Sequence, residues 1–167
     1  MNVTQVMPKY HLGCSDIGLE QAKDGSFICA RGMDYPLNMN SQVVFFNEGE
    51  ENQSIAPDGS TGLQWTTKYG YAGINAFGLS DVDEGMNTEG LSAGVLSLKS
   101  TVYPTVQTQD YPKALAIIDV CKWILSTCAT IKEVKEGLAS VVIWGEEVPI
   151  LKQVPLLHIA LHDATGK

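Results

Sequence analysis

Cys14 is the residue of this chain whose type and surroundings best suit a chemical role. It follows Gly13 and precedes a polar pair, with no apolar neighbour before Ile17, whereas a structural thiol normally sits among apolar residues. A thiol in a polar, accessible position acts as a nucleophile once it has lost its proton. The sequence therefore indicates Cys14 as a candidate nucleophile.

The other three cysteines are expected to be structural. Cys29 lies inside the apolar run 27–30, and Cys121 and Cys128 fall on one face of a helical pattern. Four cysteines at irregular spacing, without a CxxC pair, do not make the framework of a small disulfide protein. A thiol redox role is disfavoured as well, because Cys14 has no evident resolving partner.

Two charged residues are expected beside Cys14. Asp24-Gly25 is typical of a hairpin turn, here between the segments 17–22 and 26–30, and this pairing puts Arg31 opposite residue 18 and Asp34 opposite residue 15. Cys14 then lies within side-chain reach of both. A neighbouring Arg favours the thiolate, and a carboxylate can hold an ammonium or imidazolium group.

This set of residues lacks a base. His11 is only three positions from Cys14, and His158 and His162 belong to a distant segment. A cysteine that is itself the first residue carries a base in its α-amino group, whose ordinary pKa of about 7.7 to 8.0 suits it to take the thiol proton. That arrangement requires removal of residues 1–13, and the small Gly13 leaves its carbonyl open to attack by the adjacent thiol.

Residues 1–13 are expected to be a pro-segment, a cloning remnant or a frayed terminus. They contain one Lys, one His and no apolar core of the kind that a signal peptide needs. A trimmed sequence could have lost an export signal, so the compartment stays open between cytoplasm and periplasm.

Composition narrows the function classes. The chain has 167 residues, 19 acidic and 11 basic side chains and a formal net charge of −8, which argues against nucleic-acid binding. Apolar runs such as 114–120 and 154–161 fall well short of the roughly 20 residues that cross a bilayer. An apolar fraction of 44% excludes a disordered chain. We therefore expect a globular domain that acts on a small molecule, without nucleic-acid or membrane partners.

The elements that must position Cys14 are mainly short strands, followed by two helices. Asp110 with Pro112 marks the start of a helix whose apolar stripe runs to Cys128, and Thr130 to Glu133 forms a capping box for a second helix ending near Ser140. Strands are expected in the β-branched and aromatic runs that Gly, Asp, Asn and Pro separate: 17–22, 26–30, 43–46, 71–77, 91–98 and 156–162.

The last strand ends in a turn, Asp163 to Lys167, after which a return strand is expected. Without it, an apolar strand would keep an unpaired edge, which natural domains avoid. We expect the rest of the sheet to come from a companion chain or a missing C-terminal half. The alternative is a terminal strand that is paired on one side only.

Five motifs in order carry a resemblance to a known family. They are Cys14 as the first mature residue, Ala30-Arg31-Gly32-Met33-Asp34, Leu63 to Gly70, Glu84 to Leu91, and Leu157 to Lys167. The second is similar to the family element A/G-R-x-M-D and the fourth to D-G-M-N-E-K-G-L. From Cys14 to Lys167 the chain resembles the choloylglycine hydrolase family of N-terminal-nucleophile (Ntn) hydrolases, which includes penicillin V acylases and bile salt hydrolases.

The resemblance implies an α+β fold, the four-layer αββα sandwich with antiparallel sheets. Residues 14–167 would supply only the N-terminal part of that single Ntn-hydrolase domain. It also implies roles for three residues: Cys14 as the nucleophile whose amine is the base, Arg31 as the arginine near the thiol, and Asp34 as the carboxylate that orients the amine. No cofactor is implied.

The implied substrate site and oxyanion hole are less complete. One donor of the family's oxyanion hole is a backbone N–H that falls at Ser97 by counting, where relatives carry Asn, Tyr or Trp; a backbone donor survives that substitution. The other donor, an Asn side chain, and a further Arg belong to the second half of the family chain. Met33 and Tyr35 are expected at the substrate, with ordinary packing as the alternative for Tyr35.

Asn87 and the C-terminal histidines are expected to have no catalytic role. Asn87, in a loop over 84–90, is expected to bond the local backbone. His158, His162 and Asp163 look like metal ligands, but residues four apart on a strand are separated by roughly 13 Å. No metal site is therefore expected.

The sequence as a whole favours hydrolysis of a linear N-acyl amide by Cys14 through a thioester. The small-molecule substrate would join an apolar acyl group, such as a bile acid, a phenoxyacetyl group or the fatty chain of an acyl-homoserine lactone, to a small polar amine. A homo-oligomer is expected. The alternative is an unprocessed, non-catalytic protein of the same fold that acts by binding.

Overall fold

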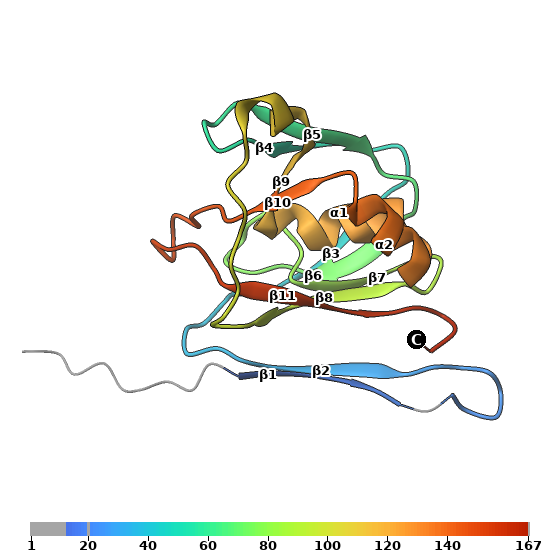
Figure 1. Cartoon of the computed structure of the whole chain (residues 1–167). Helices are drawn as coiled ribbons and strands as arrows, with labels where there is room; N and C mark the ends of the chain where they lie inside the picture. Colours follow the sequence, from blue (N-terminus) through green and yellow to red (C-terminus); the bar gives the residue numbers. More distant parts are fainter. Residues whose placement is uncertain (1–12, 20, 167) are drawn as a thin grey trace, which may run out of the picture.

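An antiparallel sheet of five strands carries helices on one face and a two-stranded hairpin on the other (Figure 1). The structure is a computed structural model that describes residues 13–19 and 21–166. The strands are β1 Gly13–Gly18, β2 Cys29–Asp34, β3 Val43–Phe46, β4 Glu51–Ile55, β5 Thr61–Thr66, β6 Tyr71–Ile74, β7 Glu84–Asn87, β8 Ser92–Ser97, β9 Ala114–Ala116, β10 Val142–Trp144 and β11 Leu157–His162. The helices are the 3₁₀ turns η1 Thr108–Lys113 and η2 Ile117–Asp119, then α1 Val120–Thr127 and α2 Ile131–Leu138.

The sheet topology confirms the expected α+β class with antiparallel sheets. The large sheet has the order β11-β8-β7-β6-β3, and β1-β2 and β4-β5 are separate antiparallel pairs. One pair departs from the expectation, because β9 and β10 run parallel. The helices, the five-stranded sheet and the hairpin form three successive layers (Figure 1), so the described residues contain part of the expected four-layer sandwich.

The N-terminal hairpin forms around the predicted turn, but its strands lie further from that turn than expected. Gly25 has a φ of +85°, and Ser26 donates from its backbone N and its hydroxyl to Asp24. The paired segments are β1 and β2 rather than 17–22 and 26–30, and Arg31 lies opposite Asp16. Toward the turn the pairing continues only through single backbone hydrogen bonds, from Leu19 N to Ile28 O and from Ala22 N to Ser26 O. The described residues there are mostly exposed.

The first predicted helix is wrong over its N-terminal half. Instead of a helix from Pro112 to Cys128, the chain forms a 3₁₀ turn, the fully buried strand β9, another 3₁₀ turn and then α1. Tertiary contacts override the helical spacing here: β9 pairs with β10, a strand that was not among those expected, and Ala116 N donates to the Ser54 hydroxyl. The second helix is confirmed, with Thr130 accepting from Glu133 N as its N-cap.

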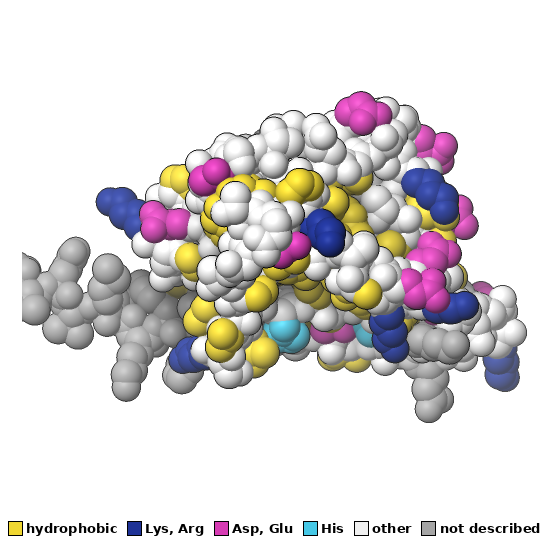
Figure 2. Space-filling view, turned by 45° about the horizontal axis from the view of Figure 1, so that its top comes forward, with side chains coloured by type: hydrophobic (Ala, Val, Ile, Leu, Met, Phe, Trp, Pro, Cys, Tyr) yellow, Lys and Arg dark blue, Asp and Glu magenta, His cyan; other side chains and the backbone are white. Residues whose placement is uncertain are grey.

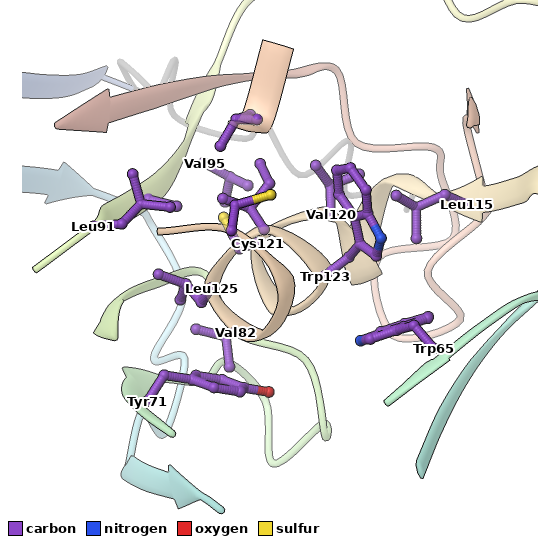
Figure 3. Packing of buried hydrophobic residues seen from close by; sticks show 14 of the residues in the cluster. Trp65, Tyr71, Val82, Leu91, Val95, Leu115, Val120, Cys121, Trp123 and Leu125 are labelled. Carbon is purple, nitrogen blue, oxygen red and sulfur yellow. The ribbon is translucent and has the colours of Figure 1, made fainter. Parts of the chain in front are cut away.

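The hydrophobic core lies between the helices and the sheet. Figure 3 shows Cys121 and Leu125 of α1 between Val95 of β8 and Val82. Burying such side chains contributes roughly 1.5 to 3 kcal/mol each. The Trp65 indole donates to the Ser126 hydroxyl at 2.8 Å, so this polar atom of the core is satisfied. The core therefore holds β7 and β8, on which the site depends, rigidly against α1.

Asn87 joins the sheet to the helical layer. Its side-chain oxygen accepts from Glu89 N and Leu91 N, and its side-chain nitrogen donates to Leu125 O and Cys128 O, at distances of 2.7 to 3.1 Å. It closes the turn between β7 and β8, as expected of a residue that bonds the local backbone, but it is the last residue of a strand and not part of a loop. The bonds to the end of α1 were not foreseen.

An apolar face of the large sheet is left uncovered beside the hairpin. The register puts Val43 and Phe45 of β3, Ile74 of β6 and Met86 of β7 on the face opposite α1, and Phe45 is 77% exposed and Val43 63%. The hairpin lies mainly against β8, and Arg31 reaches only the start of β7 at Glu84. Four large apolar side chains that share a strand face would normally be covered by another layer.

Charged side chains are dispersed on the face that Figure 2 shows. Basic side chains are scattered among acidic ones and do not gather in one patch, while hydrophobic side chains lie across the middle. Phosphate recognition requires clustered Lys and Arg. Among the described residues, no helix has the length and hydropathy needed to span a membrane.

Several carboxylates are buried near the junction of the sheet and η2. Burial raises the pKa of Asp81 to about 7, with the charges of Asp83, Asp119 and Glu146 adding to the effect. Burial likewise raises the pKa of Asp119, although the Ser54 hydroxyl donates to it at 2.7 Å and opposes that shift. Buried acids of this kind resist ionisation, so the native state holds protons that the unfolded chain releases.

Replacing Asn87 tests its role as a link between layers. Asn87→Ala removes four hydrogen bonds and leaves buried backbone groups without these partners. We therefore expect the free energy of unfolding to fall by about 3 kcal/mol in urea denaturation. Asn47→Ala, which removes only the exposed hydrogen bond from Asn47 Nδ2 to the Glu50 carboxylate, should cost less than about 0.5 kcal/mol. Equal costs for the two variants would refute the role.

The buried carboxylates predict how stability depends on pH. The folded-state pKa of Asp81 is about 7 against an ordinary value of 3.8, so between these values the native state binds more protons than the unfolded chain, and stability falls as pH rises. We expect a loss of about 2 to 4 kcal/mol between pH 4.5 and pH 8. Denaturation across this range should give a flatter profile for Asp81→Asn; an identical profile would contradict the assignment.

Candidate active site

A cavity of about 320 Å³ lies where the hairpin, the end of β8 and the segment 148–157 meet. Five residues singled out from the sequence line it together: Cys14, Arg31, Met33, Tyr35 and Ser97. The rest of its wall comes from the segments 76–83, 117–118 and 148–157 and from Met39, Val95 and Lys99. Segments far apart in the sequence thus converge on one mostly apolar cavity with few polar groups, the usual make-up of a small-molecule site.

Cys14 is placed by the pairing of β1 with β2. It lies opposite Met33, and its thiol is free and partly buried. Alternation along paired strands puts Cys14, Met33 and Arg31 on the face of the hairpin that covers β8. The thiol therefore faces the interior of the molecule and not the solvent side of the hairpin.

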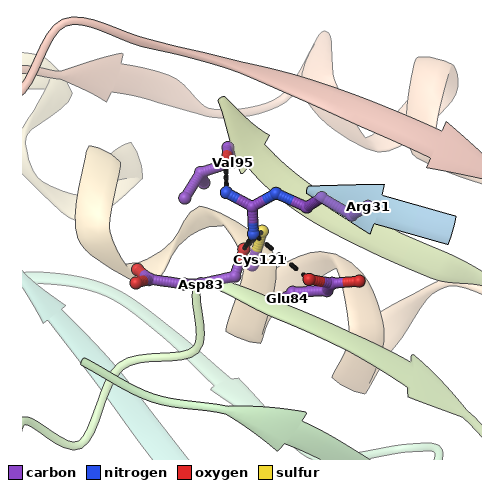
Figure 4. Close-up of polar contacts among 5 residues, drawn as sticks. All are labelled: Arg31, Asp83, Glu84, Val95 and Cys121. Carbon is purple, nitrogen blue, oxygen red and sulfur yellow. Dashed lines mark hydrogen bonds and ion pairs between the residues drawn. The ribbon is translucent and has the colours of Figure 1, made fainter. Parts of the chain in front are cut away.

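Arg31 reaches from the hairpin into the large sheet, as Figure 4 shows. One terminal nitrogen, Nη1, donates to Asp83 O at 3.2 Å and to the Glu84 carboxylate at 3.4 Å, and Nη2 donates to Val95 O. Its side chain is only 2% exposed, and its Nε has no hydrogen-bond partner within the described part of the chain.

The charge of Arg31 also acts on its neighbours. Burial raises the pKa of Asp83, and the guanidinium opposes that shift. The Cys121 thiol lies behind this group, 3.9 Å from Asp83 O, and burial raises its pKa too. Cys121 is thus kept as a neutral thiol, as a structural cysteine should be.

Asp34 does not share the cavity with the thiol, which corrects the expectation that both charged residues reach the Cys14 side chain. It is exposed on the opposite face of β2 because it is an odd number of positions from Arg31. Asp34 pairs with Gly13, and its Oδ2 lies 3.8 Å from where a Cβ on Gly13 would stand. Its carboxylate is therefore beside the residue whose carbonyl is joined to the Cys14 nitrogen.

The backbone N–H of Ser97 points away from β11. Leu98 N donates to Leu156 O on the β11 side, and Val95 N donates to Asp83 O on the other side. Donors alternate in direction along an antiparallel strand, so Ser97 N–H points to the same side as Val95 N–H. β7 begins only at Glu84, so no strand accepts from Ser97 there among the described residues.

An apolar wall completes the cavity. Tyr35 packs edge-on against Phe77, with ring centroids 5.9 Å apart, and both rings line the cavity. Phe77 has a φ of +56°, a left-handed conformation that residues with a bulky side chain rarely adopt. Tyr35 thus packs against a neighbouring ring and also lines the cavity. The sequence had left a position at the substrate and ordinary packing as alternatives, and the two are compatible here.

Sequence reasoning missed four polar residues of the cavity lining: Asp81, Asp83, Lys99 and Gln153. Asp81 is the buried one of these, within the segment 79–83, which lines the cavity almost continuously. The acidic run that leads into the Glu84 to Leu91 motif was the available signal, but charge alone does not distinguish a buried carboxylate from an exposed one.

The C-terminal histidines lie outside the cavity. His158 is exposed, and His162 Nε2 contacts the Asp16 carboxylate at 2.5 Å, which ties β11 to β1. Within residues 13–19 and 21–166, no group of His, Cys, Asp or Glu is arranged to hold a metal ion.

Comparisons with known proteins agree with this fold. The chain is 28% identical over 145 residues to a penicillin V acylase of Pectobacterium atrosepticum, covering 83% of this chain and 38% of that protein. The solved penicillin V acylase from Agrobacterium tumefaciens matches 90% of this chain with a TM-score of 0.74 and 26% identity. A variant of the conjugated bile acid hydrolase from Clostridium perfringens matches 91% with a TM-score of 0.71 and 23% identity.

The chain spans less than half the length of these relatives, covering 44% and 45% of the two solved chains. The fold match nevertheless extends over nearly all of the described residues, and it identifies the Ntn-hydrolase architecture. A profile of the family described as linear amide C–N hydrolases, choloylglycine hydrolase family, matches residues 14–167. The chain belongs to the choloylglycine hydrolase family.

Proposed function

We propose that this chain carries the nucleophile of a hydrolase that cleaves linear N-acyl amides, with the thiol of Cys14 attacking the amide carbonyl. The observation that supports it is the cavity itself, since one apolar space gathers Cys14, Arg31, Met33, Tyr35 and Ser97. Membership of a family of linear amide C–N hydrolases supports the reaction class.

The proposed reaction needs the α-amino group of Cys14 as its base, so it begins with cleavage of the Gly13-Cys14 peptide bond. The freed amine takes the proton of the thiol, and the thiolate attacks the amide carbon to give a tetrahedral intermediate. The amine then passes its proton to the leaving nitrogen, and the C–N bond breaks to leave a thioester. Water, deprotonated by the same amine, hydrolyses the thioester and restores the thiol.

Asp34 is proposed to hold that amine. Its carboxylate lies beside Gly13, at the backbone and away from the thiol, which is where an ammonium on the Cys14 nitrogen would be after cleavage. An opposite charge at this distance favours the ammonium form and fixes its orientation. Asp34 would thus orient the amine that serves as the base, while Arg31 would favour the thiolate from the cavity side.

Ser97 is proposed to contribute one donor to the oxyanion. Its N–H points past the start of β7, and its residue lines the same cavity as the thiol. A preorganised backbone donor at the developing oxyanion typically contributes about 3 kcal/mol of transition-state stabilisation. The family's second donor would come from the C-terminal half.

That half, on the same or a companion chain, is proposed to cover the apolar face formed by Val43, Phe45, Ile74 and Met86. These side chains are exposed on the sheet face that already carries the hairpin. A second sheet extending from β1-β2 would bury them, and relatives are more than twice as long as this chain.

Processing of the N-terminus tests the base. We expect intact mass and N-terminal sequencing to show that residues 1–13 are lost and Cys14 comes first, because the adjacent thiol attacks the Gly13 carbonyl. Cys14→Ala should keep all thirteen residues, and Asp34→Asn should still be processed because Asp34 is proposed to act on the freed amine. A wild-type protein that keeps its first residues would act without this base, as a non-catalytic binder would.

Hydrolysis tests the nucleophile. We expect Cys14→Ala to reduce hydrolysis at least about a thousandfold, since a covalent route is lost, on whichever of penicillin V, glycine-conjugated bile acids and acyl-homoserine lactones the wild type cleaves. Cys29→Ala is the matched control, because the Cys29 thiol contacts the Ser92 hydroxyl outside the cavity and its loss should change the rate less than about twofold. Full activity in Cys14→Ala would refute the proposal.

A further inference from the structure

Asp81 is a buried carboxylate in the cavity with unused hydrogen-bonding capacity. It is 8% exposed and lines the same cavity as Cys14. Its Oδ1 is buried and has no hydrogen-bond partner among the residues that the structure describes. A buried oxygen without a partner is costly, and a bound ligand that supplies a donor removes that cost.

The charges around Asp81 favour a positive partner. Asp83, Asp119 and Glu146 all act on Asp81 in the same direction, and with burial they raise its pKa to about 7. The two cations that line the cavity are placed elsewhere: Arg31 is bonded to Glu84 and to two backbone carbonyls, and Lys99 is exposed. An ammonium group would offset this excess of negative charge, whereas a neutral hydroxyl would offset less of it.

The position of Asp81 assigns it to the apolar part of the wall. Phe77, Leu79 and Val82, its neighbours along the chain, line the cavity with it. An apolar acyl group would bind against these side chains. A group that Asp81 contacts therefore belongs to the acyl part of a substrate and not to its leaving amine.

We propose that Asp81 is a specificity-determining residue of this cavity, which selects amides whose acyl part carries an ammonium group. This inference rests on the proposed function for the identity of the substrate class, but the binding that it describes does not require hydrolysis. The ammonium would donate to Oδ1 of Asp81 while the acyl chain packs against Phe77 and Leu79.

Calorimetric binding to the full wild-type chain tests it without any reaction, because the probes contain no amide bond. The probes are phenoxyacetic acid and its 4-aminomethyl and 4-hydroxymethyl derivatives, which differ only in the distal group. We expect the aminomethyl acid to bind at least about tenfold more tightly than phenoxyacetic acid, with the hydroxymethyl acid between them. Adding Asp81→Asn should reduce the ratio to within about twofold, whereas Glu147→Gln, an exposed carboxylate next to the cavity segment, should preserve it.

A second measurement needs no change at Asp81. Because the pKa of Asp81 is about 7, raised by burial and by Asp83, Asp119 and Glu146, the preference for the aminomethyl acid should grow as pH rises from 5.5 to 8. Equal affinities for the three probes, no binding of the aminomethyl acid, or a preference that survives Asp81→Asn would overturn the inference. Hydrolysis of unsubstituted amides by the wild type would still stand in those cases, so the two proposals fail separately.

Discussion

The guanidinium of Arg31 is the contact on which the arrangement of the site depends. The β1-β2 hairpin is not hydrogen-bonded to the large sheet as a strand, so side chains must hold it there. Arg31 does so by occupying the point where β7 and β8 separate, with donors to a carbonyl of each segment and to Glu84. Breaking this contact would leave a buried charge and remove a donor from the Val95 carbonyl, a cost of several kcal/mol. The fixed position of Arg31 in turn fixes Cys14 on the neighbouring strand.

Close packing reinforces that contact. A Cβ added at Gly94 of β8 would lie 3.4 Å from Arg31 Cδ, so the arginine lies directly against the strand beneath it. Asp16 of β1 contacts His162 of β11, and the Phe27 ring packs against the same histidine, while the Cys29 thiol adds only a weak contact to the Ser92 hydroxyl. The buried contacts of Arg31 and the contacts to His162 hold the hairpin in place although no ladder joins it to the sheet.

Local signals in the sequence were sufficient for some elements and not for others. The Asp24-Gly25 turn, the Thr130 N-cap and the strand Val43–Phe46 each depend on neighbouring residues, and all three are found as predicted. The strand Ala114–Ala116 has helical spacing, and only its distant partner β10 makes it extended. Local signals also explain part of the candidate site. Alternation along one hairpin brings Cys14 and Arg31 to the same face, and it turns Asp34 to the other face. Burial of Asp81 depends on packing between distant segments, which no local pattern reports.

The hairpin consists of two paired strands whose positions are fixed and a connection between them whose length can vary. Its paired strands end at Gly18 and begin again at Cys29, and the described residues 21–26 of the connection are exposed, whereas Phe27 near its end packs against His162. A longer or shorter connection would leave the alternation of both strands unchanged, since each is anchored by its own contacts to the sheet. The connection is therefore a place where a peptide tag or a fluorescent label can be inserted without displacing the thiol, and where related chains are free to differ in length.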